Sequence, residues 1–230
     1  MVTMIALACG LAALEAARGT SWDLALRLIL LAAIADGVDG MLARRLRATS
    51  AMGEQLDSLA DIVAFGTAPA FLFSSYYGNA PAALRFGVPF AFVVAGAYRL
   101  ARFHVQLQPT EGGFRGLPIT VAGPFLALAV VGPFGLGAWG AGGIGIAIAA
   151  LMVHDHSFPA FLPSRRWLLP AIVVASVPVV LWPRVETLSI VGALTLGAYV
   201  IWGLVGQMGN DEAQGDCPIE RGRDVVEPPS

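Results

Sequence analysis

Long apolar runs, interrupted by glycine, proline or charged residues, constrain the fold of this chain more than any other feature. Hydrophobic residues make up 57% of the sequence and charged residues 13%, and the mean hydropathy is +0.71. A run of about 20 apolar residues is long enough to cross a bilayer as a helix. The composition is therefore typical of a polytopic membrane protein and far from that of a water-soluble domain.

The apolar runs predict an all-α, polytopic transmembrane bundle of about eight spans. The expected spans are roughly 1–17, 22–43, 55–78, 81–103, 117–136, 138–153, 167–182 and 187–206. Short links such as the one from Gly78 to Pro81 indicate tight hairpins between consecutive spans. We expect a single membrane domain over residues 1–208, followed at 209–230 by a disordered cytoplasmic tail rich in acids, proline and glycine.

The arginines indicate which side of the bundle faces the cytoplasm. Three of them, Arg18, Arg85 and Arg184, fall on one side of the expected membrane, and Arg27 lies inside a span. Ten fall on the other side: Arg44, Arg45, Arg47, Arg99, Arg102, Arg115, Arg165, Arg166, Arg221 and Arg223. Because positive charge concentrates in cytoplasmic loops, the side with ten arginines is expected to be cytoplasmic. The second span ends and the third begins on this side.

Four aspartates lie at that junction, inside or beside apolar sequence: Asp36 and Asp39 in the second span, Asp57 and Asp61 in the third. A charged side chain is costly at membrane depth, so such acids are functional candidates. Asp36 and Asp39 are three residues apart, and Asp57 and Asp61 four apart, so each pair occupies one face of its helix. Facing one another, the two pairs would form a cup of four carboxylates that requires cations, most simply two divalent metal ions.

The other residues on these two faces suggest what the cup holds. Oxygen ligands without histidine or cysteine suit hard cations such as Mg²⁺ or Mn²⁺. Gly40, Ala43 and Gly53 leave space for a bulky anion, and Arg44 supplies a planar charged donor for phosphate. Paired metals beside a spare carboxylate are typical of phosphoryl-transfer chemistry. A cation or proton transporter is the alternative from another functional class, and a purely structural role for four acids is disfavoured by the cost of their burial.

These residues also carry a family resemblance. The pattern Asp36, Asp39-Gly40, Ala43-Arg44, eight residues, Gly53, Asp57, Asp61 is similar to the signature of the CDP-alcohol phosphatidyltransferases, integral membrane enzymes of phospholipid synthesis. The resemblance implies that Asp36, Asp39, Asp57 and Asp61 ligate two divalent cations, Mg²⁺ or Mn²⁺, with Asp61 also acting as general base. It implies that Gly40, Ala43, Arg44 and Gly53 bind the diphosphate of CDP-diacylglycerol.

The flanking sequence narrows the expected acceptor alcohol. The segment from Gly53 to Pro69, and Arg99-Leu-Ala-Arg102-Phe at the end of the fourth span, resemble the members of the family that use serine. Arg99 and Arg102 suit the carboxylate of a zwitterionic acceptor, although positive-inside anchoring would also explain them. These members usually have asparagine at the position of His104, and this difference affects the expected selectivity for the acceptor.

The resemblance therefore implies an enzyme that transfers the phosphatidyl group of CDP-diacylglycerol to L-serine, giving phosphatidylserine and CMP. Glycerol 3-phosphate, inositol or choline as acceptor is the alternative within the family. We expect an integral protein of the bacterial cytoplasmic (inner) membrane, with its active site facing the cytoplasm at the ends of the second and third spans. The resemblance implies a homodimer, and no nucleic-acid partner is expected.

Overall fold

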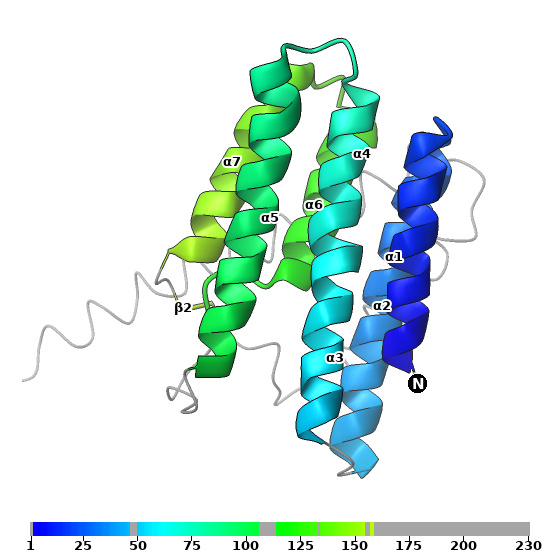
Figure 1. Cartoon of the computed structure of the whole chain (residues 1–230), viewed down its shortest axis with the longest axis vertical. Coiled ribbons are helices and arrows are strands. Elements are labelled where there is room, and N and C mark those ends of the chain that lie inside the picture. Colours follow the sequence, from blue (N-terminus) through cyan, green and yellow to red (C-terminus); the bar gives the residue numbers. More distant parts are fainter. Residues whose placement is uncertain (1, 47–49, 106–113, 133, 155–156, 159–230) are drawn as a thin grey trace, which may run out of the picture.

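The computed structural model of the chain describes residues 2–46, 50–105, 114–132, 134–154 and 157–158, and these form a bundle of helices (Figure 1). The helices are α1 (Val2–Arg18), α2 (Trp22–Leu46), α3 (Ala51–Asp61), η1 (Ile62–Thr67), α4 (Ala68–Tyr76), α5 (Ala82–Val105), α6 (Ile119–Val131) and α7 (Ala138–Val153). Two short strands, β1 (Phe114–Arg115) and β2 (Ser157–Phe158), pair antiparallel beside the bundle.

The first six predicted spans correspond to helices in the structure, with α3, η1 and α4 forming the third span as one continuous rod. The expected spans 167–182 and 187–206 and the tail 209–230 lie outside the described residues. The turn predicted between Gly78 and Pro81 separates α4 from α5, and Arg85 donates a hydrogen bond of 2.7 Å to the Gly78 carbonyl across it. Successive rods of the bundle, with α3, η1 and α4 counted as one, run in opposite directions, so the start of α1, the end of α2 and the start of α3 lie toward the same end of the bundle (Figure 1).

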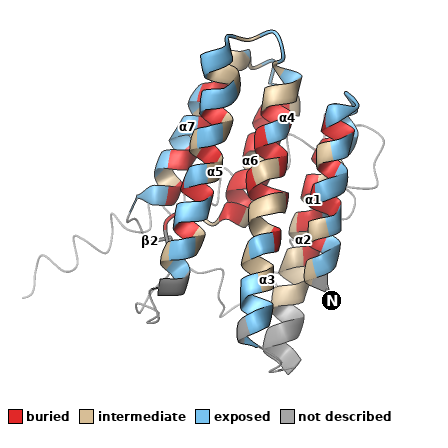
Figure 2. Ribbon diagram, in the orientation of Figure 1, coloured by how far each residue is buried: buried red, intermediate tan, exposed pale blue. Residues whose placement is uncertain are grey.

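Many large apolar side chains lie on the outer surface of the bundle. Two helical stretches among the described residues, Met52–Tyr76 and Ala82–Phe103, are long and apolar enough by length and composition to cross a membrane. Large hydrophobic side chains point away from the bundle, including Phe90 and Trp139, which are 72% and 73% exposed. Figure 2 shows the buried residues along the inner faces of the helices and exposed residues around the outside. This distribution fits a chain surrounded by lipid, where an apolar outer face carries no cost.

The third span differs from the prediction of an uninterrupted helix over 55–78. It begins earlier, at Ala51, because Ser50 caps it by accepting a hydrogen bond from the Gly53 amide at 3.1 Å. Directly after Asp61 the helix widens into the π-helical turn η1. Pro69 has no amide hydrogen to donate, and the wider turn before it accommodates the proline ring. The Thr67 hydroxyl satisfies the Ile62 carbonyl at 3.0 Å within this turn.

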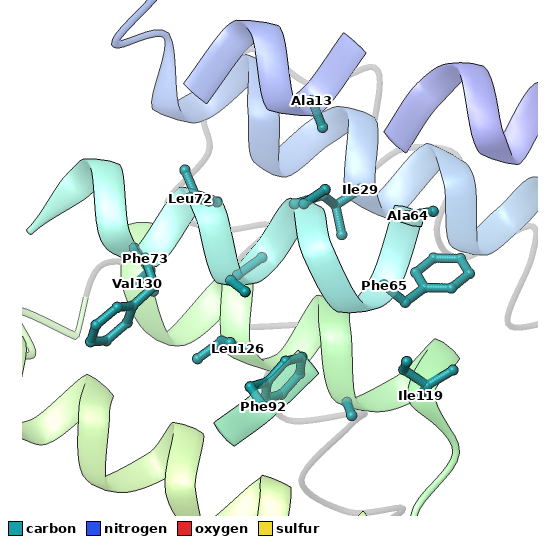
Figure 3. Close-up of a cluster of buried hydrophobic side chains, with 14 of the residues drawn as sticks. Ala13, Ile29, Ala64, Phe65, Leu72, Phe73, Phe92, Ile119, Leu126 and Val130 are labelled. Atoms are coloured by element: carbon teal, nitrogen blue, oxygen red, sulfur yellow. The ribbon is translucent and has the colours of Figure 1, made fainter. Parts of the chain in front are cut away.

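The π-helical turn lies at the centre of the buried core. Figure 3 shows Ala64 and Phe65 of η1 among side chains from α1, α2, α5 and α6. Two glycines allow the neighbouring helices to approach it closely. A Cβ atom on Gly10 of α1 would lie 2.7 Å from the Ala64 Cα, and one on Gly123 of α6 would collide with the Phe65 carbonyl. The helix carrying Asp57 and Asp61 is thus held from two sides immediately beyond the second aspartate.

Candidate metal centre

Three of the four predicted aspartates converge between α2 and α3. Asp36 comes from α2, and Asp57 and Asp61 come from successive turns of α3. One carboxylate oxygen from each lies within 4.8 Å of the other two, and all three side chains are at least partly buried. The i, i+4 spacing aligns Asp57 with Asp61, and the antiparallel packing of α2 and α3 brings Asp36 to them.

This donor set fits a hard divalent cation. Ca²⁺, Mg²⁺ and similar ions take carboxylate oxygens at about 2.0–2.6 Å, so oxygens bound to one ion lie about 3–5 Å apart. The spacing of at most 4.8 Å among Asp36, Asp57 and Asp61 falls in that range. Three carboxylates this close repel one another strongly without a cation between them. The cluster therefore has the composition and the spacing of a metal site.

Asp39, the fourth predicted ligand, is held differently. Thr3 of α1 donates a hydrogen bond through its hydroxyl to Oδ2 of Asp39. Asp39 is not among the three clustered carboxylates, although it is close enough to Asp57 for their charges to interact. Of the four carboxylates that the sequence places in one cup, three thus cluster in the structure, and the fourth interacts with Asp57 and bonds Thr3 of α1.

The residues predicted to bind the diphosphate surround this cluster on α2 and α3. Gly40 is partly buried one residue after Asp39, and Gly53 is exposed in the first turn of α3. Ala43 and Arg44 lie near the end of α2, and their side chains are outside the part of the chain that the structure describes. Gly53 also has a local role, because its amide is the one that Ser50 caps. Diphosphate binding by these four residues stays a prediction.

The two predicted acceptor-binding arginines face different partners. Arg99 of α5 is buried, and its guanidinium is close enough to Asp61 for their charges to interact. Arg102, one turn further on, donates a hydrogen bond of 3.1 Å to the Val153 carbonyl at the end of α7. Arg99 thus connects α5 to the carboxylate cluster, whereas Arg102 connects it to the last turn of α7. The binding of serine by either residue stays a prediction.

Sequence reasoning missed two residues that support the site. Thr3 carries no recognisable signal, since a threonine in an apolar run is ordinary, and only the packing of α1 on α2 reveals its contact with Asp39. Ser50 could have been found, because a serine directly before a helix is a common N-cap. The cap fixes the point at which α3, the helix that carries Asp57 and Asp61, begins.

The sequence is similar to a known protein family and to individual proteins that carry one name. The sequence model of the CDP-alcohol phosphatidyltransferase family matches residues 1–182. Three similar proteins are each named CDP-diacylglycerol–serine O-phosphatidyltransferase. The Bacillus subtilis protein is 33% identical over 186 residues, covering 73% of this chain and 96% of that protein. The Methanocaldococcus jannaschii protein is 38% identical over 136 residues, covering 58% and 63%. The Helicobacter pylori protein is 39% identical over 105 residues, covering 45% of this chain and less than half, 44%, of that protein.

Proposed function

Because the chain belongs to the CDP-alcohol phosphatidyltransferase family, we propose that it transfers the phosphatidyl group of CDP-diacylglycerol to L-serine, forming phosphatidylserine and CMP. The family consists of membrane-bound enzymes that use divalent metals. The observation that carries the proposal is the convergence of Asp36, Asp57 and Asp61, three residues of the family signature, on one point beside a buried arginine. The names of the similar proteins support serine as the acceptor.

Asp36, Asp39, Asp57 and Asp61 are the proposed ligands of two divalent cations, Mg²⁺ or Mn²⁺. Asp57 would hold a cation together with Asp36 and Asp61, and its charge also interacts with that of Asp39, the fourth proposed ligand. When bound, the cations would neutralise the diphosphate and the charge that develops on the leaving CMP. Gly40, Ala43, Arg44 and Gly53 are the proposed contacts of that diphosphate, with Arg44 donating charge-assisted hydrogen bonds.

In the proposed reaction Asp61 is also the general base. Its carboxylate accepts the proton of the serine hydroxyl, and the hydroxyl oxygen attacks the phosphorus that bears the diacylglycerol. A bond forms between serine and that phosphorus, the bond from phosphorus to the bridging oxygen breaks, and CMP leaves with the bridging oxygen. Asp61 suits this role because it is the aspartate nearest the π-helical turn, which fixes its helix against the core.

Arg99 is the proposed partner of the serine carboxylate. Its guanidinium is buried and interacts with the charge of Asp61, so an acceptor bound to it would present its hydroxyl near the base. A guanidinium binds a carboxylate through two parallel hydrogen bonds, which also orient the acceptor. Inositol and choline have no anionic group for this contact, and glycerol 3-phosphate offers a phosphate in place of a carboxylate, so the acceptor panel must include it. Arg102 is a second candidate, and its guanidinium also donates a hydrogen bond to the carbonyl at the end of α7.

The proposed setting is the bacterial cytoplasmic membrane, with the carboxylate cluster facing the cytoplasm. Arginines follow the end of α2 and occur at the end of α5, as expected for cytoplasmic ends of spans. A site near the membrane surface would let the lipid chains of CDP-diacylglycerol remain in the bilayer while serine enters from water. A homodimer is proposed on the family resemblance alone.

The deciding experiment is an acceptor panel with the purified full chain in lipid nanodiscs that contain CDP-diacylglycerol. CMP release is measured with L-serine, glycerol 3-phosphate, inositol and choline, each with Mg²⁺ or Mn²⁺. We expect release with L-serine and formation of phosphatidylserine. Release only with another acceptor would retain the reaction class and overturn the serine assignment. Absence of CMP release with every acceptor, together with metal uptake into vesicles, would favour a cation transporter instead.

A further inference from the structure

The contact between α1 and Asp39 points to a residue that the family signature does not include. The Thr3 hydroxyl donates to Oδ2 of Asp39, 36 residues further along the chain, and the contact is partly buried. Thr3 lies in the first turn of α1, so its hydroxyl has no carbonyl of a preceding turn of that helix to bond. Its hydrogen bond joins α1 to the carboxylate beside the metal cluster. The side chain therefore bridges two helices at the candidate site.

The packing of α1 in the core fixes the position of the Thr3 hydroxyl. Ala6, Cys9 and Ala13 of α1 are buried in the core, so α1 does not depend on Thr3 for its place in the bundle. At Gly10 the same helix packs so closely against Ala64 of η1 that a Cβ atom would collide with it. A hydroxyl on a helix held in this way has little freedom to follow Asp39. It thereby restricts where Asp39 can turn its carboxylate.

The carboxylate of Asp39 has two oxygens, and the hydrogen bond engages only Oδ2. Without the donor, the charge repulsion between Asp39 and Asp57 would favour rotation of the Asp39 carboxylate away from its neighbour. Groups that hydrogen-bond to metal ligands commonly set ligand orientation, and their loss costs about 10–100-fold in metal affinity or activity. Thr3 has the geometry of such a group.

We propose that Thr3 is a positioning residue, whose hydroxyl holds Oδ2 of Asp39 and leaves Oδ1 available as a metal ligand near Asp57. The inference rests on the role of Asp39 as a ligand in the proposed function. It assigns to α1 a part in the metal site, in addition to its part in the core. It is independent of which alcohol accepts the phosphatidyl group.

The test measures Mn²⁺ binding to the full chain in nanodiscs without substrate, using the electron paramagnetic resonance signal of free Mn²⁺. Thr3→Val keeps the shape of the side chain and removes the donor, whereas Thr3→Ser keeps the donor. We expect Thr3→Val to weaken Mn²⁺ binding about tenfold, at the low end of the range for residues behind metal ligands, and Thr3→Ser to retain it. Thr3→Ala also lacks the donor and should weaken Mn²⁺ binding to the same extent. It replaces Thr3→Val in the test if the valine variant folds poorly.

Ser75→Ala is the matched control. Ser75 donates a hydrogen bond of 2.9 Å to the Ala17 carbonyl, so its loss removes a hydroxyl contact at the opposite end of α1, away from the carboxylates. This variant should bind Mn²⁺ as the wild type does. A second control places Thr3→Val in an Asp39→Asn background, where we expect no further loss, because the ligand that Thr3 positions is already gone.

Wild-type Mn²⁺ affinity in both Thr3→Val and Thr3→Ala would overturn the proposal. So would an equal loss of affinity from Thr3→Val in the wild-type and Asp39→Asn backgrounds, since Thr3 would then act on the site by another route. A different result would exclude the proposed function while the positioning role of Thr3 is retained. A wild-type chain whose Mn²⁺ binding depends on Thr3, but which releases no CMP with L-serine, would retain the positioning role and exclude the serine transferase.

Discussion

Arg99 of α5 is buried with its guanidinium close enough to Asp61 of α3 for the two charges to interact. The two residues are 38 positions apart and belong to helices that run in opposite directions. A buried cation beside a group of three carboxylates reduces their mutual repulsion. It also places a guanidinium, which can bind a carboxylate, near the proposed base, as the proposed amino-acid acceptor would need.

Replacing Arg99 should therefore affect the acceptor more than the lipid substrate. We expect Arg99→Ala to raise the KM for L-serine about 10–100-fold, the equivalent of about 1.5–3 kcal/mol for hydrogen bonds to a charged group. The KM for CDP-diacylglycerol should change far less. Steady-state CMP release, with each substrate varied in turn, measures both constants.

Arg102→Ala is the informative comparison for that experiment. In the wild type the Arg102 guanidinium bonds the Val153 carbonyl, so losing this side chain should weaken the attachment of α7 and lower the thermal midpoint of the protein. An equal rise in the serine KM for both alanine variants would instead support the pairing of the two arginines that the sequence predicts. A rise in the KM for CDP-diacylglycerol alone in Arg99→Ala would contradict the acceptor assignment.

Removal of divalent metal should abolish turnover. Asp36, Asp57 and Asp61 lie within 4.8 Å of one another, and their charges need a cation between them. We expect excess EDTA to reduce CMP release to background and to lower the thermal midpoint, because an ion that binds only the folded state stabilises it. Added Mg²⁺ or Mn²⁺ should restore both. Full activity in EDTA would exclude the metal assignment.

Asp61→Asn tests the general base. The amide occupies the same space but cannot take the serine proton, so we expect kcat to fall at least about 100-fold while CDP-diacylglycerol still binds. Glu54→Gln is the matched control, since Glu54 is an exposed acid on the same helix and belongs to no cluster among the described residues. It should retain wild-type kcat. A kcat within tenfold of wild type in Asp61→Asn would assign the proton transfer to another group.

Gly53 allows the diphosphate prediction to be separated from helix capping. We expect Gly53→Leu to block CDP-diacylglycerol binding, because leucine would fill space proposed for the diphosphate. A Cβ at this position would also lie 3.1 Å from the Ser50 hydroxyl oxygen and so crowd the cap. Ser50→Ala removes the cap alone, at a cost of about 1 kcal/mol of stability. Should Ser50→Ala raise the KM for CDP-diacylglycerol as much as Gly53→Leu does, the effect of Gly53 would come from the cap.

Gly10 tests the packing that holds the π-helical turn. A side chain there would meet the Ala64 backbone at 2.7 Å, which cannot move without shifting η1. We expect Gly10→Val to lower stability by about 1–3 kcal/mol, seen as a lower thermal midpoint in detergent. Gly87→Val is the control, because a Cβ on this exposed glycine meets nothing within 4 Å. Equal midpoints for the two variants would show that η1 tolerates displacement.

Much of the fold could be predicted because the determining signals are local. The apolar runs predicted the helices, and all six runs that fall on described residues are helical. The helices α6 (13 residues) and α7 (16 residues) are shorter than the roughly 20 residues of a typical span. The π-helical turn was not predicted, because it depends on how Pro69 and Thr67 are accommodated in three dimensions, which no periodicity records.

In the candidate site, too, local sequence patterns predicted some features and tertiary packing decided the others. The sequence by itself determined the family signature and the pairing of Asp57 with Asp61, because residues four apart on a helix share a face whatever surrounds them. The tertiary structure alone decided that Asp36 joins them, that Asp39 accepts a hydrogen bond from Thr3, and that the charge of Arg99 interacts with that of Asp61 while Arg102 bonds the Val153 carbonyl. These relationships depend on the rotation and height of one helix against another. Those are set by close contacts such as Gly10 on Ala64, which join residues far apart in the chain.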